Sequence, residues 1–155
     1  MIDSLSRVFC SVLSSDKHGA IDEVIDKCSI FSELSDKPRF IRAVHRRERQ
    51  QSTGIGHGVA IAHGKLPDIR KPVIALGFSD KGIIFDDRYP DPVQLIFVIA
   101  SSLHGGSEYL RAVSSILTWV HDPDFRRVLV GKEWEDERVV RFFSMLSSQE
   151  FRPQY

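Results

Sequence analysis

The chain has 155 residues, of which 42% are hydrophobic and 27% are charged, a composition typical of one globular domain with a substantial core. Lysine plus arginine and aspartate plus glutamate both total 21, so the net charge is zero. This balance argues against a general binder of nucleic acid or of an anionic membrane.

The two cysteines, Cys10 and Cys28, are too few and too unpatterned for a disulfide framework or a zinc site, and we expect two reduced core thiols. The first residues lack a basic region followed by a long apolar run. No later segment approaches the roughly 18 apolar residues of a membrane span. We therefore expect a single cytoplasmic domain over residues 1–155, without direct membrane insertion.

The N-terminal third predicts two helices and one segment that stays open. Residues 2–13 have apolar spacing that fits a helix, but Arg7 to Leu13 fit a short strand equally well. A capping side chain at Ser15-Asp16, followed by apolar residues at helical spacing, predicts a helix. The sequence Ser35-Asp36-Lys37-Pro38 predicts the start of a second helix, which delivers Arg47 and Glu48 near its end.

The rest of the chain alternates strands and helices. Apolar runs predict strands at residues 59–62, 72–78, 82–85 and 93–100, and the last is the most hydrophobic and is expected to be central. Helices are predicted from 105 to 120, from 122 to 131 and from 134 to 146, followed by a loose tail over 147–155. This order predicts a single three-layer α/β domain, with a mixed central sheet flanked by helices on both faces.

The stretch from Arg47 to Leu66, RERQQSTGIGHGVAIAHGKL, concentrates the residues that can carry chemistry. Three glycines at alternate positions, Gly54, Gly56 and Gly58, allow a sharp turn whose N–H groups can approach a ligand closely. The apolar run that follows predicts a buried strand with His63 at its end. The dinucleotide fingerprint and the phosphate-binding P-loop are both absent, because neither glycine spacing matches.

This stretch resembles the active-site segment of the enzyme IIA domains of the bacterial phosphotransferase system, in the fructose, mannitol and nitrogen-regulatory group. The family pattern is an Arg-Glu pair, Ser/Thr-Gly-Ile-Gly-x-Gly, an apolar run and Pro-His. Arg47-Glu48, residues 52–58 and residues 59–63 match it, and Gly64-Lys65-Leu66 is similar to the nitrogen-regulatory branch. The resemblance implies a phosphotransferase/anion transport protein-like fold, with a phosphoryl group carried by His63.

Two positions depart from the family pattern. Ala62 replaces the proline that usually precedes the histidine, which removes a φ constraint. Tyr109 stands where family members usually carry a second histidine, and its hydroxyl can still donate to a phosphate oxygen. His104 could substitute only if the loop 101–106 folds back. His57 occupies the variable position of the turn and is expected to be exposed.

Phosphoryl transfer to His63 requires a neutral imidazole and donors for the charge on the equatorial oxygens. The planar guanidinium group of Arg47 is expected to donate hydrogen bonds to these oxygens. Backbone N–H groups of the turn from Gly54 through Gly56 to Gly58, with the hydroxyls of Ser52 and Thr53, are the predicted phosphate-binding groups. No cofactor is implied, and no metal is implied because His63, Glu48 and Asp68 show no recognised ligand spacing.

The leading interpretation is a phosphocarrier with a phosphohistidine intermediate, similar to the nitrogen-regulatory branch, that receives its phosphoryl group from an HPr-like phosphocarrier protein. It would act mainly by regulated binding to other proteins, whose identity the sequence leaves open. Sugar transfer through separate membrane permease components stays open as well. The alternative is a binding module that keeps the fold and is no longer phosphorylated. A nucleotide-binding α/β enzyme is a third and weaker hypothesis.

Overall fold

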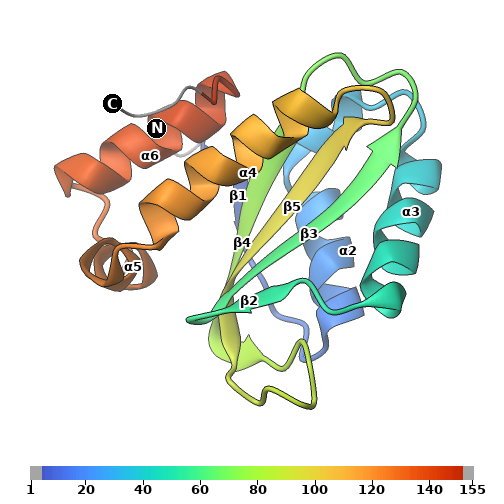
Figure 1. Ribbon diagram of the computed structural model, residues 1–155. Helices are drawn as coiled ribbons and strands as arrows, with labels where there is room; N and C mark the ends of the chain where they lie inside the picture. The colour runs from blue at the N-terminus through green and yellow to red at the C-terminus, as the bar shows by residue number, and fades with distance from the viewer. Residues whose placement is uncertain (1–4, 152–155) are drawn as a thin grey trace.

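A central sheet lies between two layers of helices in the computed structural model, which describes residues 5–151 (Figure 1). Helices α2 (Lys17–Lys27) and α3 (Lys37–Gln50) cover one face, and α4 (Gly106–Val120), α5 (Pro123–Val130) and α6 (Glu137–Ser148) lie on the other. The predicted three-layer α/β architecture is confirmed. Within the described range, every helix is too short or too polar to cross a bilayer.

The five strands form one mixed sheet in the order β1-β4-β5-β3-β2. Strand β5 is central, as predicted, and pairs parallel with β3 and antiparallel with β4. The strands are β1 (Phe9–Ser11), β2 (Gly54–Gly56), β3 (Val59–Leu66), β4 (Val73–Ile83) and β5 (Val93–Ser102), and a short 3-10 helix, η1 (Ser29–Glu33), links α2 to α3.

The structure settles the open N-terminal segment and corrects two strand predictions. Residues 9–11 form a strand, β1, that pairs parallel with β4. The predicted strand at 82–85 is not separate, because β4 continues to Ile83 through Gly82, whose φ of 76° lies where the register with β5 shifts. Strand β3 runs on to Leu66, so His63 lies inside the strand rather than at its end.

The C-terminal segment is packed more tightly than the sequence indicates. Helix α6 begins after its capping residue Asp136, later than predicted, and extends through Ser148. The Gln149 side chain accepts from the Ile74 N–H at 2.7 Å and donates to the Ile74 carbonyl at 2.9 Å, and Phe151 is buried. Residues 147–151 are therefore docked on β4 rather than loose, whereas the rest of the predicted tail lies outside the described residues, as does the start of the chain at 1–4.

The local helix signals in the first half of the chain are confirmed. The Asp16 carboxylate caps α2 by accepting from the Gly19 N–H at 2.8 Å, and the Asp36 carboxylate caps α3 by accepting from the Arg39 N–H at 3.0 Å. Cys10 and Cys28 are buried free thiols, as expected.

Helix α3 packs directly against β3, with Phe40 and Val44 buried between them. A Cβ atom built on Gly64 would come within 2.8 Å of Val44 Cγ2 and 3.1 Å of the Val44 backbone nitrogen. Gly64 therefore permits this helix-to-strand distance, and with it the position of the last turn of α3, which carries Arg47 and Glu48.

Candidate functional site

The candidate site lies where β3 passes the first turns of α4. His63, on β3, is half-buried, and its Nδ1 lies 3.3 Å from the Tyr109 hydroxyl oxygen on α4. The two ring centroids are 5.2 Å apart. Lys65 lies two residues further along the same strand, and its Nζ is 5.5 Å from the Tyr109 ring centroid. Sequence reasoning did not select Lys65, although the two-residue period of a strand places its side chain on the same face as His63.

The surroundings of His63 favour a neutral ring. Burial lowers the pKa of the His63 imidazole below its usual range, and the nearby Arg47 cation lowers it further, while hydrogen bonding to the Ile61 backbone acts in the opposite direction. Burial also raises the pKa of the Tyr109 hydroxyl, so this group keeps its proton. At neutral pH the site therefore holds an uncharged imidazole beside a protonated phenol, and the imidazole has the charge state that a nucleophilic nitrogen requires.

Arg47 reaches this pair from the opposite layer of the sheet. It lies in the last turn of α3, and its Nη1 donates to the Gln51 carbonyl at 2.7 Å. Its charge acts on the pKa of both His63 and Tyr109. The approach is possible because the observed pairing of β2 with β3 ends at Ile61, whose N–H donates to the Thr53 carbonyl at 3.0 Å. The edge of β3 is thus open beside His63.

Glu48 is the residue that sequence reasoning left without a role. Its side chain is almost fully buried and accepts from the Thr53 N–H at 2.9 Å and from the Thr53 hydroxyl. The Lys17 ammonium lies 3.3 Å away and also donates to the Phe85 carbonyl at 2.9 Å. A signal was present, because Glu48 continues the buried stripe of Phe40 and Val44 at intervals of four residues.

This network changes the interpretation of the predicted phosphate-binding hydroxyls. Thr53 is buried and its hydroxyl donates to Glu48, so it fixes the chain rather than facing a ligand. Ser52 is partly exposed, and its Oγ accepts from the Gly54 N–H at 3.2 Å. Of these two residues, only Ser52 is partly accessible to solvent.

The glycine turn leads away from His63 instead of folding over it. Gly56 pairs with Val59, and His57 and Gly58 form a two-residue hairpin connection with φ values of 57° and 77°. Val59 precedes His63 by four residues of extended strand, a separation of about 13 Å. The structure therefore does not bring Gly56 and Gly58 to His63, and Gly54, which pairs with Ala60, lies about 10 Å along the strand. His57 is exposed, as expected.

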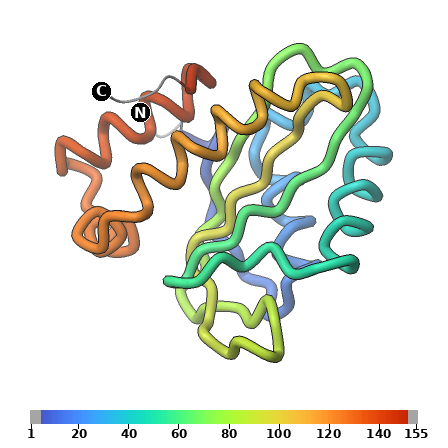
Figure 2. Tube along the Cα trace, in the orientation of Figure 1, coloured from blue at the N-terminus to red at the C-terminus, as the bar shows by residue number. Residues whose placement is uncertain are grey.

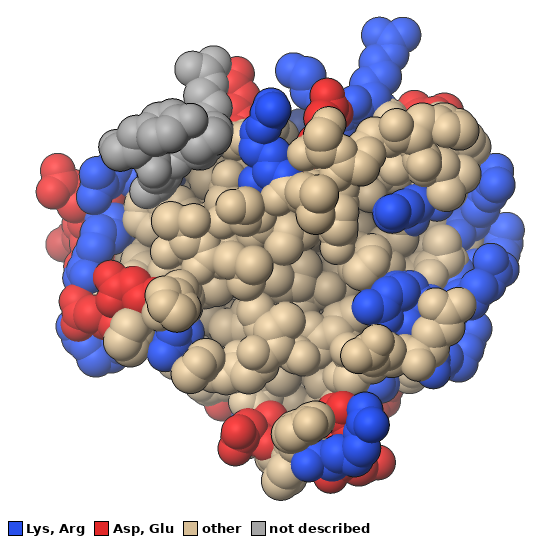
Figure 3. All heavy atoms as spheres, viewed as in Figure 1, with Lys and Arg blue, Asp and Glu red and all other residues tan. Residues whose placement is uncertain are grey.

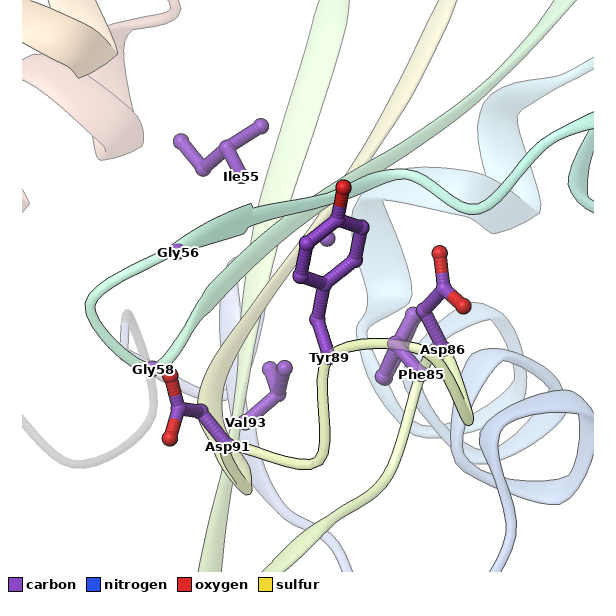
Figure 4. Close-up of a pocket in the computed structure, with 9 residues that line it drawn as sticks. Ile55, Gly56, Gly58, Phe85, Asp86, Tyr89, Asp91 and Val93 are labelled. Carbon is purple, nitrogen blue, oxygen red and sulfur yellow. The ribbon is translucent and has the colours of Figure 1, made fainter.

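The hairpin instead borders a pocket of about 320 Å³ that it shares with the loop before β5. Figure 2 shows the hairpin turn and this loop at the same end of the sheet. In Figure 4 the Tyr89 ring lies between the loop and β2, with Asp86 and Asp91 on the same loop. His63, Arg47 and Tyr109 do not line this pocket, so it is a separate feature.

The face of the molecule that presents α4 carries exposed leucines and few charges. Figure 3 shows few charged side chains across its centre. Leu103 precedes α4 and is 51% exposed, and Leu110 on α4 is 65% exposed. Leu117 is exposed one heptad after Leu110, so it lies on the same side of α4. His104 is exposed and its N–H donates to Ser102 Oγ, so it is Tyr109 that contacts His63.

Comparison with known proteins identifies fructose-specific components as relatives. The chain is 31% identical over 117 residues to the fructose-specific EIIA component of Haloferax volcanii, which covers 76% of each chain. It is 32% identical over 126 residues to the fructose-specific EIIABC component of Bacillus subtilis, which covers 81% of this chain but only 20% of that longer protein.

The fold is shared with solved IIA proteins. The nitrogen regulatory protein IIA-Ntr of Neisseria meningitidis superposes with a TM-score of 0.74 at 23% identity, covering 92% of this chain and 94% of that one. The mannitol enzyme IIA of Escherichia coli, solved in a complex with phosphorylated enzyme IIB, superposes with a TM-score of 0.72 at 18% identity, covering 90% and 94%.

The family model described as phosphoenolpyruvate-dependent sugar phosphotransferase system, EIIA 2, matches residues 3–145. This match spans the β3 strand with His63, the end of α3 and the whole sheet. The chain therefore belongs to the EIIA 2 family of the phosphotransferase system.

Proposed function

We propose that this protein is a cytoplasmic phosphocarrier that accepts a phosphoryl group on His63 from an HPr-like phosphocarrier protein and regulates other proteins by binding them. The observation that carries this proposal is the neutral, half-buried imidazole beside Arg47 and the Tyr109 hydroxyl, at an open sheet edge. Family membership adds that such proteins work with other components of the phosphotransferase system.

The contact between His63 and Tyr109 suggests which nitrogen attacks. If Nδ1 carries the proton and donates to the Tyr109 oxygen, the lone pair is on Nε2. Nε2 then attacks the phosphorus of the donor phosphohistidine. A new N–P bond forms as the donor N–P bond breaks, and the electron pair of the broken bond stays on the donor nitrogen. No proton has to move in this step.

In this proposal three groups support the transfer. Arg47 Nη1 donates to the Gln51 carbonyl, and the other N–H groups of the guanidinium can donate to phosphoryl oxygens. Lys65 adds a second cation on the His63 side of the sheet. The Tyr109 oxygen accepts from Nδ1–H and so keeps the proton on that nitrogen, which is the supporting role that we propose for it at the position of the family's second histidine.

The apolar surface around α4 suits a docking partner. Leu103, Leu110 and Leu117 are exposed on that side, and transient protein interfaces combine apolar contacts with a polar rim. An incoming phosphocarrier that covers these leucines would bring its phosphohistidine over His63 and exclude water from the transfer.

The test is incubation with phosphoenolpyruvate, enzyme I and an HPr-like protein, followed by intact mass measurement. We expect a gain of one phosphoryl group that is lost in His63→Ala and retained in His57→Ala. His57 is a suitable control because it is an exposed histidine of the same segment.

A second candidate function rests on Tyr109. If Tyr109 in place of the second histidine reflects a loss of phosphoryl transfer, the protein is a binding module that keeps the enzyme IIA fold but is not phosphorylated. Absence of labelling, under conditions that label an authentic enzyme IIA, would support this alternative. Labelling followed by passage of the phosphoryl group to an enzyme IIB component would instead favour sugar uptake over a purely regulatory role.

A further inference from the structure

The outer face of α3 carries a row of four arginines, Arg39, Arg42, Arg46 and Arg49, which we call the arginine stripe. Their spacing of three, four and three residues places them along one side of a helix, over an axial length of about 15 Å. All four side chains are exposed. Figure 3 shows Lys and Arg side chains gathered on the flank of the molecule over α3.

The arginines of the stripe lack ion pairs in the described part of the chain. Within residues 5–151, none of its four guanidinium groups forms an ion pair with a carboxylate, whereas four arginines outside α3, Arg7, Arg88, Arg127 and Arg138, do. Examples are Arg88 with Asp86 at 3.1 Å and Arg138 with Asp124 at 2.6 Å. The stripe is therefore a run of unpaired cations along one helix of a chain with zero net charge.

Helix stability does not account for this arrangement. Cations are favourable near a helix C-terminus, which covers Arg49 in the last turn. Arg39 lies in the first turn, where the macrodipole disfavours a cation and where α3 has no acidic residue. Like charges three and four residues apart also repel each other. The stripe is thus unfavourable in the isolated chain, and an anionic partner would relieve it.

The flanks of the stripe restrict the shape of that partner. Asp22 on α2 lies 2.6 Å from His45 Nε2 and is 57% exposed, so a carboxylate borders α3. The helices run antiparallel, because Lys17 contacts Glu48 while Asp22 contacts His45. Asp26 therefore lies one turn further along the same border and is exposed. A wide polyanion such as duplex DNA or an anionic bilayer would press its phosphates against these carboxylates.

We propose that the arginine stripe is a docking surface for an acidic α-helix of a partner protein. Glutamates or aspartates at the same spacing on a facing helix would meet each guanidinium, and a single helix is narrow enough to avoid the α2 carboxylates. The surface is distinct from the His63 site, and docking there does not require phosphorylation.

The experiment uses the unphosphorylated protein and a fluorescent synthetic helical peptide with glutamates spaced by three, four and three residues. We expect salt-sensitive binding by anisotropy that is weakened about tenfold or more by the double change Arg42→Glu and Arg46→Glu. The double change Arg42→Gln and Arg46→Gln should give an intermediate loss. Circular dichroism checks that each variant is folded.

The matched control is the double change Arg111→Glu and Arg141→Glu, which alters the same charge on α4 and α6 and should leave peptide binding within about twofold. A glutamine version of the peptide should not bind. Duplex DNA and vesicles of phosphatidylglycerol with phosphatidylcholine should bind at least about tenfold more weakly than the acidic peptide. The proposal is overturned if the peptide fails to bind, if the control weakens binding equally, or if DNA or vesicles bind as tightly.

Discussion

The residues of the segment 47–66 lie at two ends of the structure that differ in burial and in surroundings, although the segment is continuous in sequence. At one end, His63, Tyr109 and the Arg47 charge meet beside a buried anchor made by Glu48 and Thr53. At the other, the glycine hairpin is exposed and borders a different pocket. One continuous sequence motif therefore contributes to two separate regions of the structure. The contacts between Glu48 and Thr53 connect the end of α3 to the segment that leads into the hairpin.

The anchor is the part whose loss should matter most. Glu48→Ala would leave the Thr53 N–H and hydroxyl without their acceptor and the partly buried Lys17 without its counter-charge. We expect destabilisation of about 2–3 kcal/mol, since Lys17 can still reach water, and a fall in Tm of roughly 5–10 °C. Thermal unfolding followed by circular dichroism measures this, with Glu48→Gln as the milder comparison. An unchanged Tm would mean that the network contributes little.

Arg47→Lys should slow phosphorylation of His63 by about tenfold or more while leaving the fold intact, because an ammonium cannot reproduce the planar fork. The rate of phosphoryl transfer, followed by mass spectrometry at early times, gives the effect. Arg46→Lys is the control, since Arg46 is exposed on the outer face of α3. A normal rate in Arg47→Lys would remove Arg47 from the site.

Tyr109→Phe removes only the hydroxyl that lies 3.3 Å from His63 Nδ1. Loss of one hydrogen bond of about 1 kcal/mol predicts a transfer rate about fivefold lower. Tyr89→Phe makes the same change at the hairpin pocket and should leave the rate unaltered. Equal effects of the two substitutions would contradict the separation of the two ends.

Gly56→Ala examines the hairpin directly. Gly56 has a φ of 90° and open space where a Cβ would lie, so the substitution adds backbone strain without a clash. We expect a loss of about 1 kcal/mol in the free energy of unfolding and no change in transfer rate. A slower transfer in a fully folded variant would show that the hairpin acts on the phosphoryl group after all.

The smallest expected effect concerns pH. The pKa of His63 is lowered by burial and then by Arg47, so the ring stays neutral as the pH falls through the usual range, and transfer should decline only below it. Arg47→Gln removes the cation and should raise the pKa of His63, which moves the acid limb of the rate profile to higher pH. Arg47→Lys keeps the charge and should leave this limb in place. Titration of the ring signals by NMR measures the shift.

Structural features that depend on a few neighbouring residues could be predicted from the sequence. Asp16 and Asp36 with Pro38 begin helices as predicted, because a capping side chain needs only its own helix. The hydrophobic run of β5 indicated its central place, because a strand covered on both faces has almost no polar positions.

Features that depend on contacts between residues far apart in the sequence could not be predicted. The sequence did not show that β3 continues past His63, because a glycine such as Gly64 often marks the end of a strand. Here Gly64 instead allows α3 to pack closely against β3. The direction of the glycine hairpin follows from its pairing with β3, and alternate glycines are compatible with many turns. The role of Glu48 depends on Thr53 and on Lys17, which lies 31 residues earlier in the chain.

The close packing at Gly64 has a consequence for variation in this protein. Even a methyl group there would have to push α3 outward, because one of its nearest obstacles is helix backbone rather than a side chain that can rotate. Arg47 and Glu48 would then be carried away from the imidazole together. In the proposed carrier, transfer can thus be weakened through the helix layer behind the sheet, by a substitution whose added side chain points away from the imidazole.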